Sequence, residues 1–396
     1  MDAVKNPYSP GAGNTPPELA GRAQVIENVL VAIQRISAGR SDQGAILVGL
    51  RGVGKTVLLK HISSLAANKG VICVEVEAPE GKSLPELLIS ELRSVLIKLD
   101  YLEGAKDKLT KAAGVLRNFI GGLKLKIEGI EISLPSGSMP TSAPGLADSG
   151  DLDKDLKDLF IAIGHAASEK NTAIALCIDE LQYVPERELG SLISAYHACC
   201  QSNLPIAIIG AGLPQLKGLL GKAKSYSERL FAFYNIGPLD DDAATQALVL
   251  PARKEGVIFE DQAVTEILKQ TKGYPYFLQE WGSKSWNSAS QSPINLLDVT
   301  KATQLALLHL DVSFFAVRFD RCTPNERLYM RAMAACDSDI VRSGEIAEKL
   351  NKTPQQVGPP KNSLFKKGMI YSPAHGDTAF TVPLFADFMR RKIPNF

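Results

Sequence analysis

The chain has 396 residues, of which 45% are hydrophobic and 22% are charged, and its formal net charge is +1. These values describe a globular protein of roughly two or three domains. The nearly neutral net charge excludes an overall electrostatic field that would attract nucleic acid or membranes, so any basic surface must be local. No apolar run reaches the roughly 18 residues of a membrane span, and residues 1–15 lack the apolar core of a signal peptide. Six scattered cysteines without paired zinc spacing predict reduced thiols in a cytoplasmic protein.

Residues 1–15 are rich in Gly, Asn and Pro, and they predict a disordered tail. From residue 16 to residue 239, strand-like apolar runs alternate with helical patterns. We expect strands at 45–49, 71–77, 173–179, 205–210 and 230–236. We expect helices at 23–38, 55–67, 84–99, 152–169, 187–201 and 213–221. This alternation favours an α/β domain in which a parallel sheet is covered on both faces.

One segment, residues 104–150, breaks the alternation. It begins with a basic helix-like stretch, and two short alternating runs, 123–127 and 130–134, then flank Glu128-Gly129, which is a hairpin signal. A Ser/Pro/Gly/Ala-rich loop follows. The segment is either an inserted arm used for contacts or a tolerated surface insertion, and the sequence leaves both interpretations open.

A phosphate loop follows the first expected strand. The stretch from Gly49 to Thr56 reads as a glycine, four residues, then Gly-Lys-Thr. Glycines let the backbone curl so that N–H groups point at phosphate oxygens, and the following helix adds its positive dipole end. Lys55 would reach the β- and γ-phosphates, and Thr56 would bind Mg²⁺. The residues expected to bind ATP or ADP here are Gly49, Arg51, Gly52, Val53, Gly54, Lys55, Thr56 and Val57.

An acidic strand end supplies the second half of an ATP site. The apolar run 173–178 leads directly into Asp179 and Glu180. Asp179 would bind Mg²⁺ through water, and Glu180 would be the general base that orients the attacking water. The alternative is a strand that ends in two solvated carboxylates. The phosphate loop upstream favours the catalytic interpretation, and the doublet favours hydrolysis over nucleotide binding alone.

After Pro238 the strand signals stop, and residues 240–315 predict a small helical domain with helices at 241–251, 261–271, 276–290 and 298–314. The phosphate loop, the Asp-Glu strand end and this helical lid resemble the AAA+ and STAND branches of the P-loop ATPases. The chain looks most similar to bacterial and archaeal ATPases related to the origin-recognition initiators. The resemblance covers nearly the whole chain from about residue 16.

The resemblance extends to residues around the base. Gly21 and Arg22 resemble the family's "GRE" entry motif, which wraps the adenine, although Ala23 replaces its acid. Gly273-Tyr274-Pro275 resembles the lid motif of STAND ATPases, which implies that Pro275 packs on the base. A plain turn between two helices is the alternative for this tripeptide.

Two departures from the family pattern predict slow turnover. The strand 205–210 lacks the Asn, Ser or Thr of sensor 1, and the lid helix after Gly273 lacks the arginine of sensor 2. A slow switch fits these residues better than a motor. Arg229 resembles by its position the arginine finger that completes a neighbour's site, which implies a homo-oligomer when ATP is bound. The alternative for Arg229 is a local salt bridge.

Residues 316–396 predict a winged helix-turn-helix. Thr323-Pro324-Asn325-Glu326 resembles a capping box that starts the first helix. A second helix is expected at 343–350 and a third up to Gly368, and two β-like runs follow. The resembled ATPases carry such a domain at this place.

Local charge in this domain indicates double-stranded DNA as a partner. From Arg342 onward there are nine basic residues and four acids, so the segment is positive while the whole chain is nearly neutral. Gly358-Pro359-Pro360 is expected to interrupt the start of the recognition helix, which argues against base reading. Many winged helices dock on proteins instead, and this alternative stays open. The candidate DNA-binding residues, most of which would contact phosphates, are Lys352, Lys361, Asn362, Lys366 and Lys367.

Three functions remain possible from the sequence. The first is a DNA-binding ATPase that self-associates with ATP and releases DNA after hydrolysis. The second is a STAND-type signalling switch that holds ADP and uses a separate effector protein. The third is an ATP-binding scaffold that does not hydrolyse, which ranks last because the catalytic positions are complete.

Overall fold

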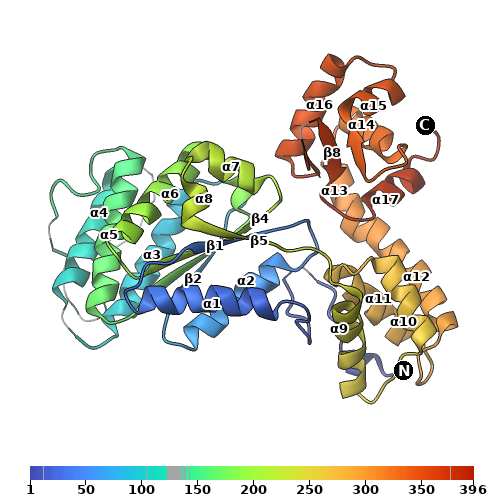
Figure 1. The fold of residues 1–396 in the computed structure, drawn as a ribbon, viewed down its shortest axis with the longest axis horizontal. Coiled ribbons are helices and arrows are strands. Elements are labelled where there is room, and N and C mark those ends of the chain that lie inside the picture. Colours follow the sequence, from blue (N-terminus) through green and yellow to red (C-terminus); the bar gives the residue numbers. More distant parts are fainter. Residues whose placement is uncertain are drawn as a thin grey trace. The chain divides into compact units, whose positions relative to one another are not determined.

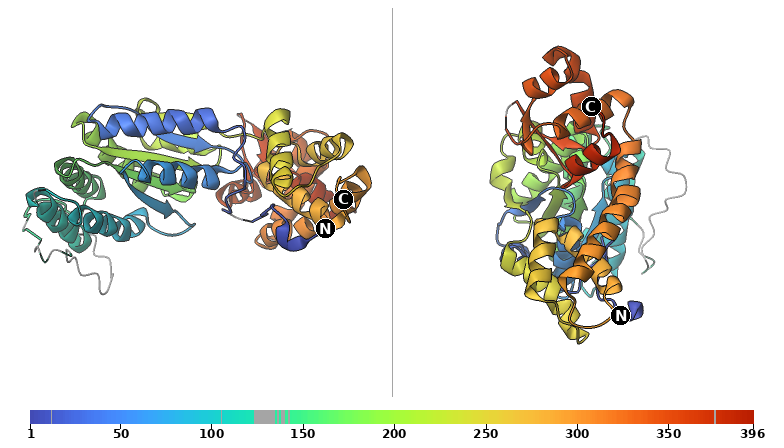
Figure 2. Two further views of the ribbon diagram at one scale, coloured as in Figure 1. Left: turned by 90° about the horizontal axis from the view of Figure 1, so that it is seen from below. Right: turned by 90° about the vertical axis from the view of Figure 1, so that its right-hand side faces the viewer.

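A computed structural model describes residues 1–11, 13–104, 106–122, 135, 137, 140–141, 143–374 and 376–396. The chain divides into two compact units, whose elements are shown in Figures 1 and 2. Unit 1 contains Met1–Arg22, Gly49–Gly54 and Ile236–Phe396. Unit 2 contains Ala23–Val48 and Lys55–Asn235. The division along the chain therefore falls inside the phosphate loop, between Gly54 and Lys55.

Unit 2 is built on a five-stranded sheet whose order is β2-β3-β4-β1-β5. Every neighbouring pair in it is parallel, which confirms the predicted α/β fold class. β1, β3 and β4 are fully buried, as expected for the central strands of a sheet covered on both faces. The strands are β1 (Gly44–Val48), β2 (Ile72–Glu77), β3 (Ile174–Asp179), β4 (Ile206–Gly212) and β5 (Phe231–Asn235).

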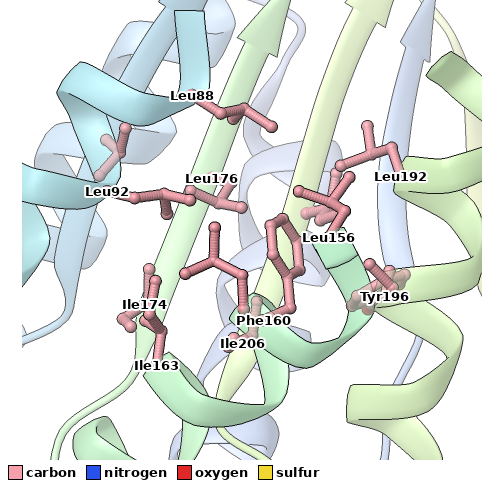
Figure 3. Packing of buried hydrophobic residues seen from close by; sticks show 14 of the residues in the cluster. Leu88, Leu92, Leu156, Phe160, Ile163, Ile174, Leu176, Leu192, Tyr196 and Ile206 are labelled. Carbon is pink, nitrogen blue, oxygen red and sulfur yellow. The ribbon is translucent and has the colours of Figure 1, made fainter. Parts of the chain in front are cut away.

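Helices cover both faces of this sheet. They are α1 (Ala23–Ser37), α2 (Lys55–Ala67), α3 (Leu84–Asp100), α4 (Asp107–Gly122), α5 (Leu152–Glu169), α6 (Glu186–Gln201), α7 (Leu216–Ala223) and α8 (Ser227–Leu230), with a short 3₁₀ turn η2 (Leu181–Tyr183) after β3. Figure 3 shows side chains from α3, α5 and α6, such as Leu92, Phe160 and Tyr196, gathered over Leu176 of β3. α2 lies on the opposite face, where Ser63 bonds the thiol of Cys177.

The 104–150 segment contains α4, which packs on α3 and α5 and contributes to the same core. The hairpin predicted at 123–134 lies outside the described residues. The backbone at Thr141 passes close to α4, because a Cβ at Gly114 would overlap the carbonyl of Thr141. The described part of the segment is therefore packed against the domain.

The lid belongs to unit 1 and consists of helices, as predicted for residues 240–315. Its helices are α9 (Asp241–Lys254), α10 (Asp261–Thr271), α11 (Pro275–Ser288) and α12 (Leu296–Leu310), and α12 continues through a π-helical turn η3 (Asp311–Phe315) into α13 (Ala316–Asp320). Side chains of the lid and of the C-terminal residues share one hydrophobic cluster. Phe315 of η3 packs on Phe388 with ring centroids 5.2 Å apart, so the helix that leaves the lid is anchored in the C-terminal domain.

The C-terminal domain, residues 316–396, contains the three helices and the hairpin expected from the sequence. Its further elements are α14 (Pro324–Ala334), β6 (Ile340–Arg342), α15 (Ser343–Lys349), α16 (Pro354–Lys366), β7 (Ile370–Tyr371), β8 (Asp377–Phe380) and α17 (Phe385–Lys392). The strands form an antiparallel sheet of order β6-β8-β7. The elements follow the order helix, strand, helix, helix, strand, strand, helix, of which β6 and α17 were not expected from the sequence. The winged helix stays a prediction.

The expected interruption of the third helix is wrong, because α16 runs unbroken through Pro359 and Pro360. The helix is held at its start by a reciprocal capping box between Thr353 and Gln356. The two prolines lack N–H groups, so the carbonyls of Gln355 and Gln356 have no helical donor four residues later. Both residues are exposed, and water can satisfy these carbonyls.

The expected disordered tail is wrong over the first nine residues, which pack on the lid (Figures 1 and 2). The phenol of Tyr8 is buried and donates to the carbonyl of Leu248. The amide of Asn6 bonds Ser283 of α11. These contacts depend on residues far along the chain, so the composition of the segment did not reveal them.

A candidate nucleotide-binding site

The glycines of the phosphate loop have the backbone geometry that the motif requires. Gly52 and Gly54 have φ values of 82° and 89°, in the left-handed region that favours glycine. A Cβ at Gly49 would overlap the carbonyl of Ile236, so only glycine fits where the loop leaves β1. The loop ends at Lys55, the first residue of α2. Its N–H groups and the helix start therefore form a local anion-binding geometry.

Within unit 1, one of the two predicted base-site residues, Arg22, contacts this loop. The guanidinium of Arg22 donates to the carbonyls of Gly237 and Val53, at 3.4 Å for Val53. Burial lowers the pKa of Arg22, and the carboxylate of Asp240 opposes that shift. Gly21, beside it, has a φ of 68° and packs closely on Ala243. The contact of Gly21 and Arg22 with adenine stays a prediction.

The start of α11 meets the same loop. Pro275 is the first residue of α11, and the N–H of Tyr276 donates to the carbonyl of Gly52 at 3.2 Å. Gly273 has a φ of 70°, and a Cβ there would overlap the carbonyl of Leu239. The tripeptide is therefore a constrained turn that joins the lid to the phosphate loop. Packing of Pro275 on a base stays a prediction.

In unit 2, the first turn of α2 meets the end of β3. The hydroxyl of Thr56 donates to a carboxylate oxygen of Asp179 at 2.5 Å. Asp179 is 7% exposed, and burial raises its pKa, as does the nearby charge of Glu180, while the bond from Thr56 lowers it. A hydroxyl and a buried carboxylate side by side are oxygen ligands of the kind Mg²⁺ prefers. The residues present therefore fit a Mg²⁺ site.

Glu180 lies next to this pair. Its backbone is left-handed, with φ 56°, and its N–H donates to Asp179 at 2.8 Å. Its carboxylate accepts a hydrogen bond from the side-chain amide of Gln182, a residue that sequence reasoning missed. Lys55, also in unit 2, is 8% exposed and lies near enough to lower the pKa of Asp179. The structure thus brings Lys55, Thr56, Asp179 and Glu180 together.

Arg229, the candidate finger, lies in the short helix α8 and is exposed. Its carbonyl accepts a hydrogen bond from Gln43 at 2.9 Å, which fixes its backbone. No ion pair involves its guanidinium in the part of the chain that the structure describes. The local salt bridge considered as the alternative is thus not observed among these residues.

The five candidate DNA-binding residues fall into two groups. Lys361 donates to the hydroxyl of Ser343 at 2.6 Å, and Lys367 pairs with the buried carboxylate of Glu326 at 2.8 Å. These two lysines stabilise the C-terminal domain internally. Lys352, Asn362 and Lys366 are exposed.

No helix among the described residues is long and apolar enough to span a bilayer. Those residues also contain no group of three or more His, Cys, Asp or Glu side chains suited to a metal. None of the six cysteines forms a disulfide bond.

Comparison with known proteins supports the site. Residues 18–209 match the AAA ATPase domain family, and residues 312–389 match a domain of unknown function (DUF8462). The chain is 24% identical over 399 residues to MJ0774 of Methanocaldococcus jannaschii, an uncharacterized HTH-type transcriptional regulator. That alignment covers 95% of this chain and 89% of the relative.

Solved structures are similar over most of the chain. The Walker-type ATPase PABY2304 of Pyrococcus abyssi has a TM-score of 0.57 at 18% identity, with 94% of this chain and 96% of that chain covered. The Orc1 protein of Aeropyrum pernix, solved in complex with DNA, has a TM-score of 0.48 at 13% identity, with 95% and 94% covered.

The AAA match contains the phosphate loop, the Thr56–Asp179 pair and Glu180. The fold shared with the Pyrococcus ATPase agrees with it. Residues 18–209 of the chain therefore form an AAA ATPase domain.

Proposed function

We propose that this protein is a slow ATPase that acts as a nucleotide-controlled switch and binds double-stranded DNA through its C-terminal domain. One observation carries the proposal. The chain combines the catalytic side chains of an ATPase with an exposed helix whose residues are of the types that contact DNA. ATP would drive self-association through Arg229, and hydrolysis would reverse it. The unpaired cysteines support a place in the reducing cytoplasm.

The chemistry of hydrolysis follows from the positions of the side chains. Lys55 and the amides at the start of α2 would hold the β- and γ-phosphates. Glu180 would orient the attacking water and accept its proton, since its carboxylate is only half-buried and water can reach it. Thr56 and Asp179 would hold Mg²⁺, which neutralises phosphate charge when bound. This set supports hydrolysis over the non-hydrolysing scaffold.

The exposed face of α16 supports DNA as the partner. Gln355, Pro359, Asn362 and Lys366 are exposed and recur at helical spacing, so they share one face. Gln and Asn can pair with the adenine edge in the major groove, whereas Lys grips phosphates. Unbroken helix geometry through Pro359 and Pro360 removes the argument against base reading. The printed description of MJ0774 as an HTH-type regulator points in the same direction.

DNA binding is tested by the anisotropy of a labelled duplex at low salt, with Mg²⁺ and either ATP or ADP. Wild type should bind with ATP, and Lys366→Met should weaken binding on all sequences and reduce the salt slope by about 1. Lys69→Met, at an exposed lysine of unit 2, is the matched control and should change nothing. If wild type binds no duplex with ATP at low salt, the DNA proposal is wrong.

A second candidate, a STAND-type switch with a protein partner, is favoured by one contact within unit 1. The N–H of Arg51 in the phosphate loop donates to the carbonyl of Thr381, just after β8, at 3.0 Å. The C-terminal domain would then respond to the nucleotide by docking on the phosphate loop. A separate effector protein would bind the C-terminal domain once it leaves the loop. Such a protein should purify with bound ADP, and a nucleotide-free preparation under gentle conditions would count against it.

A further inference from the structure

One glutamine connects the end of β3 to the end of β4. Gln182, in the turn η2, uses both ends of its side-chain amide within unit 2. Its Nε2 donates to the carboxylate of Glu180, and its Oε1 accepts the N–H of Leu213 at 2.9 Å. Leu213 follows directly on Gly212, the last residue of β4.

The orientation of this amide is fixed by chemistry. The N–H of Leu213 can only donate, so the atom of Gln182 that faces it must be the oxygen. The nitrogen is then turned toward Glu180, whose ionised carboxylate can only accept. Every partner is therefore satisfied in one orientation, and the opposite flip would place two donors and two acceptors face to face.

The glycines at the end of β4 make room for this arrangement. A Cβ at Gly212 would lie 2.6 Å from Oε1 of Gln182, and a Cβ at Gly210 would overlap the side chain of Leu181. An Asn, Ser or Thr at the end of this strand would therefore displace Gln182. The lack of a polar sensor side chain on β4 thus has a structural counterpart, because a side chain from η2 occupies that space.

We propose that Gln182 is a positioning residue that sets the orientation of Glu180 for hydrolysis. The inference rests on the proposed ATPase function. The amide fixes the orientation of the Glu180 carboxylate, which would accept the proton of the attacking water. Gln182 itself neither gains nor loses a proton, so it acts through geometry. The same amide couples Glu180 to the backbone of β4, so a shift of that strand end would reorient the base.

The backbone of Glu180 is held by bonds that do not involve the side chain of Gln182. Its φ of 56° is unfavourable for a residue with a side chain, and the backbone bonds on either side hold it there. The N–H of Tyr183 bonds the carbonyl of Glu180 at 3.0 Å, which closes the turn. The backbone is therefore fixed, and the amide of Gln182 fixes the side chain.

Two variants of Gln182 test the proposal by steady-state ATP turnover. Gln182→Ala should lower kcat at least tenfold and leave the KM for ATP within a factor of two to three, because it removes orientation and leaves the phosphate loop intact. Gln182→Glu keeps the acceptor for Leu213 but places a second carboxylate against Glu180. It should shift the acidic limb of the pH–rate profile to higher pH, because like charge raises the pKa of the base. Gln201→Ala, an exposed glutamine at the end of α6, is the matched control.

The outcomes separate this inference from the proposed function. A kcat of Gln182→Ala that equals or exceeds that of wild type would overturn the positioning role. A fall in kcat that is matched by lost ATP binding and a lowered melting temperature, with no shift in the pH profile of Gln182→Glu, would also overturn it in favour of a structural role. Glu180→Gln is assayed beside them, since turnover unchanged in that variant would refute the proposed hydrolysis itself.

Discussion

The hydroxyl of Thr56 lies 2.5 Å from a carboxylate oxygen of Asp179, and it donates a hydrogen bond to it. Thr56 is the second residue of α2, and Asp179 is the last residue of β3. β1 and β3 are not neighbours, because β4 lies between them in the sheet. The bond therefore spans the end of β4, whose last three residues are Gly210, Ala211 and Gly212.

This pair predicts a pH dependence for Mg²⁺-dependent ATP binding. Burial raises the pKa of Asp179 above 3.8, and a metal must displace the proton. Binding should therefore weaken as pH falls, and it should do so at higher pH than for an ordinary aspartate. Mg²⁺ titrations of ATP binding at a series of pH values measure the effect. Asp179→Asn should bind ATP with little dependence on Mg²⁺, and a wild-type affinity that stays constant down to pH 3.8 would contradict the expectation.

The raised pKa of Asp179 also makes the stability of the nucleotide-free protein depend on pH. A carboxyl group whose folded pKa is raised contributes stability that is present below its unfolded pKa of 3.8 and is lost as pH rises through the folded pKa. The side chain in Asp179→Asn cannot ionise, so this variant avoids the free-energy cost of ionising a buried carboxyl group. The stability of this variant relative to wild type, followed by urea unfolding, should increase as pH rises through that window.

Gly212→Ala is predicted to impair turnover through Gln182. The new Cβ would lie 2.6 Å from Oε1 of Gln182, so the amide must move away from Glu180. We expect a loss in kcat of the same order as in Gln182→Ala, with ATP binding retained. Gly218→Ala, in α7, has no atom within 4 Å of the new Cβ and should turn over ATP as wild type does. Equal turnover in both glycine variants would show that the space beside Gly212 is not used.

Features that depend on residues close together in the sequence could be predicted, whereas features that depend on contacts between distant residues could not. The phosphate loop and the Asp179-Glu180 doublet are local patterns, because strand, loop and helix follow one another along the chain. The parallel sheet also followed from alternating periodicity, and the strand ends were predicted to within a few residues. Gln182 was not predicted, since its role depends on the approach of η2 to the end of β4, which no local pattern specifies. The related sequence signal was the lack of Asn, Ser or Thr in the strand 205–210, which predicted the loss of a sensor.

Lys366 and Lys367 are adjacent, yet they are predicted to differ in function. Lys367 pairs with Glu326, which caps α14 and is 3% exposed, whereas Lys366 is exposed. Lys367→Met should destabilise the C-terminal domain by roughly 1–3 kcal/mol, because it leaves a buried carboxylate without its cation. Lys366→Met should leave the melting temperature unchanged and weaken DNA binding. If the two variants lose the same stability, the assignment of the internal and external lysine is wrong.

The Glu326 pair also predicts acid sensitivity. Burial alone would raise the pKa of Glu326, but hydrogen bonds from Lys367, Ser363 and the N–H of Thr323 outweigh it and lower the pKa below 4.5. A depressed carboxyl pKa contributes stability that is present above pH 4.5 and is lost as pH falls through the folded pKa. Glu326→Gln should remove this part of the pH dependence. Unfolding of the wild type and the variant between pH 3 and pH 6 measures the difference.

The N-terminal segment is predicted to stabilise the lid through Tyr8. Burial raises the pKa of this phenol, so it stays a neutral donor to the carbonyl of Leu248. Tyr8→Phe should cost about 1–2 kcal/mol, because a buried carbonyl loses its donor. Tyr101→Phe, at a residue that is 75% exposed, is the control and should cost nothing measurable. Equal melting temperatures for both variants would mean that the segment adds no stability.

The C-terminal domain illustrates the limits of sequence patterns in another way. Two adjacent prolines predicted a broken helix, yet α16 continues because a proline costs only the bonds of its own missing N–H and the crowding behind it. The affected carbonyls lie on exposed residues, where water satisfies them. Likewise, charge alone could not distinguish Lys366 from Lys367, since the partner of Lys367 is a capping residue 41 positions earlier.

The most direct test is ATP turnover of wild type and Glu180→Gln, each with and without duplex DNA at low salt, with ATP binding measured in parallel. The account predicts slow wild-type turnover that rises with DNA, and a variant that binds ATP as tightly but does not hydrolyse it. Turnover that is indifferent to DNA would favour the protein-docking switch. Turnover that is unchanged by Glu180→Gln would contradict the assignment of Glu180 as the base, and with it the proposed mechanism.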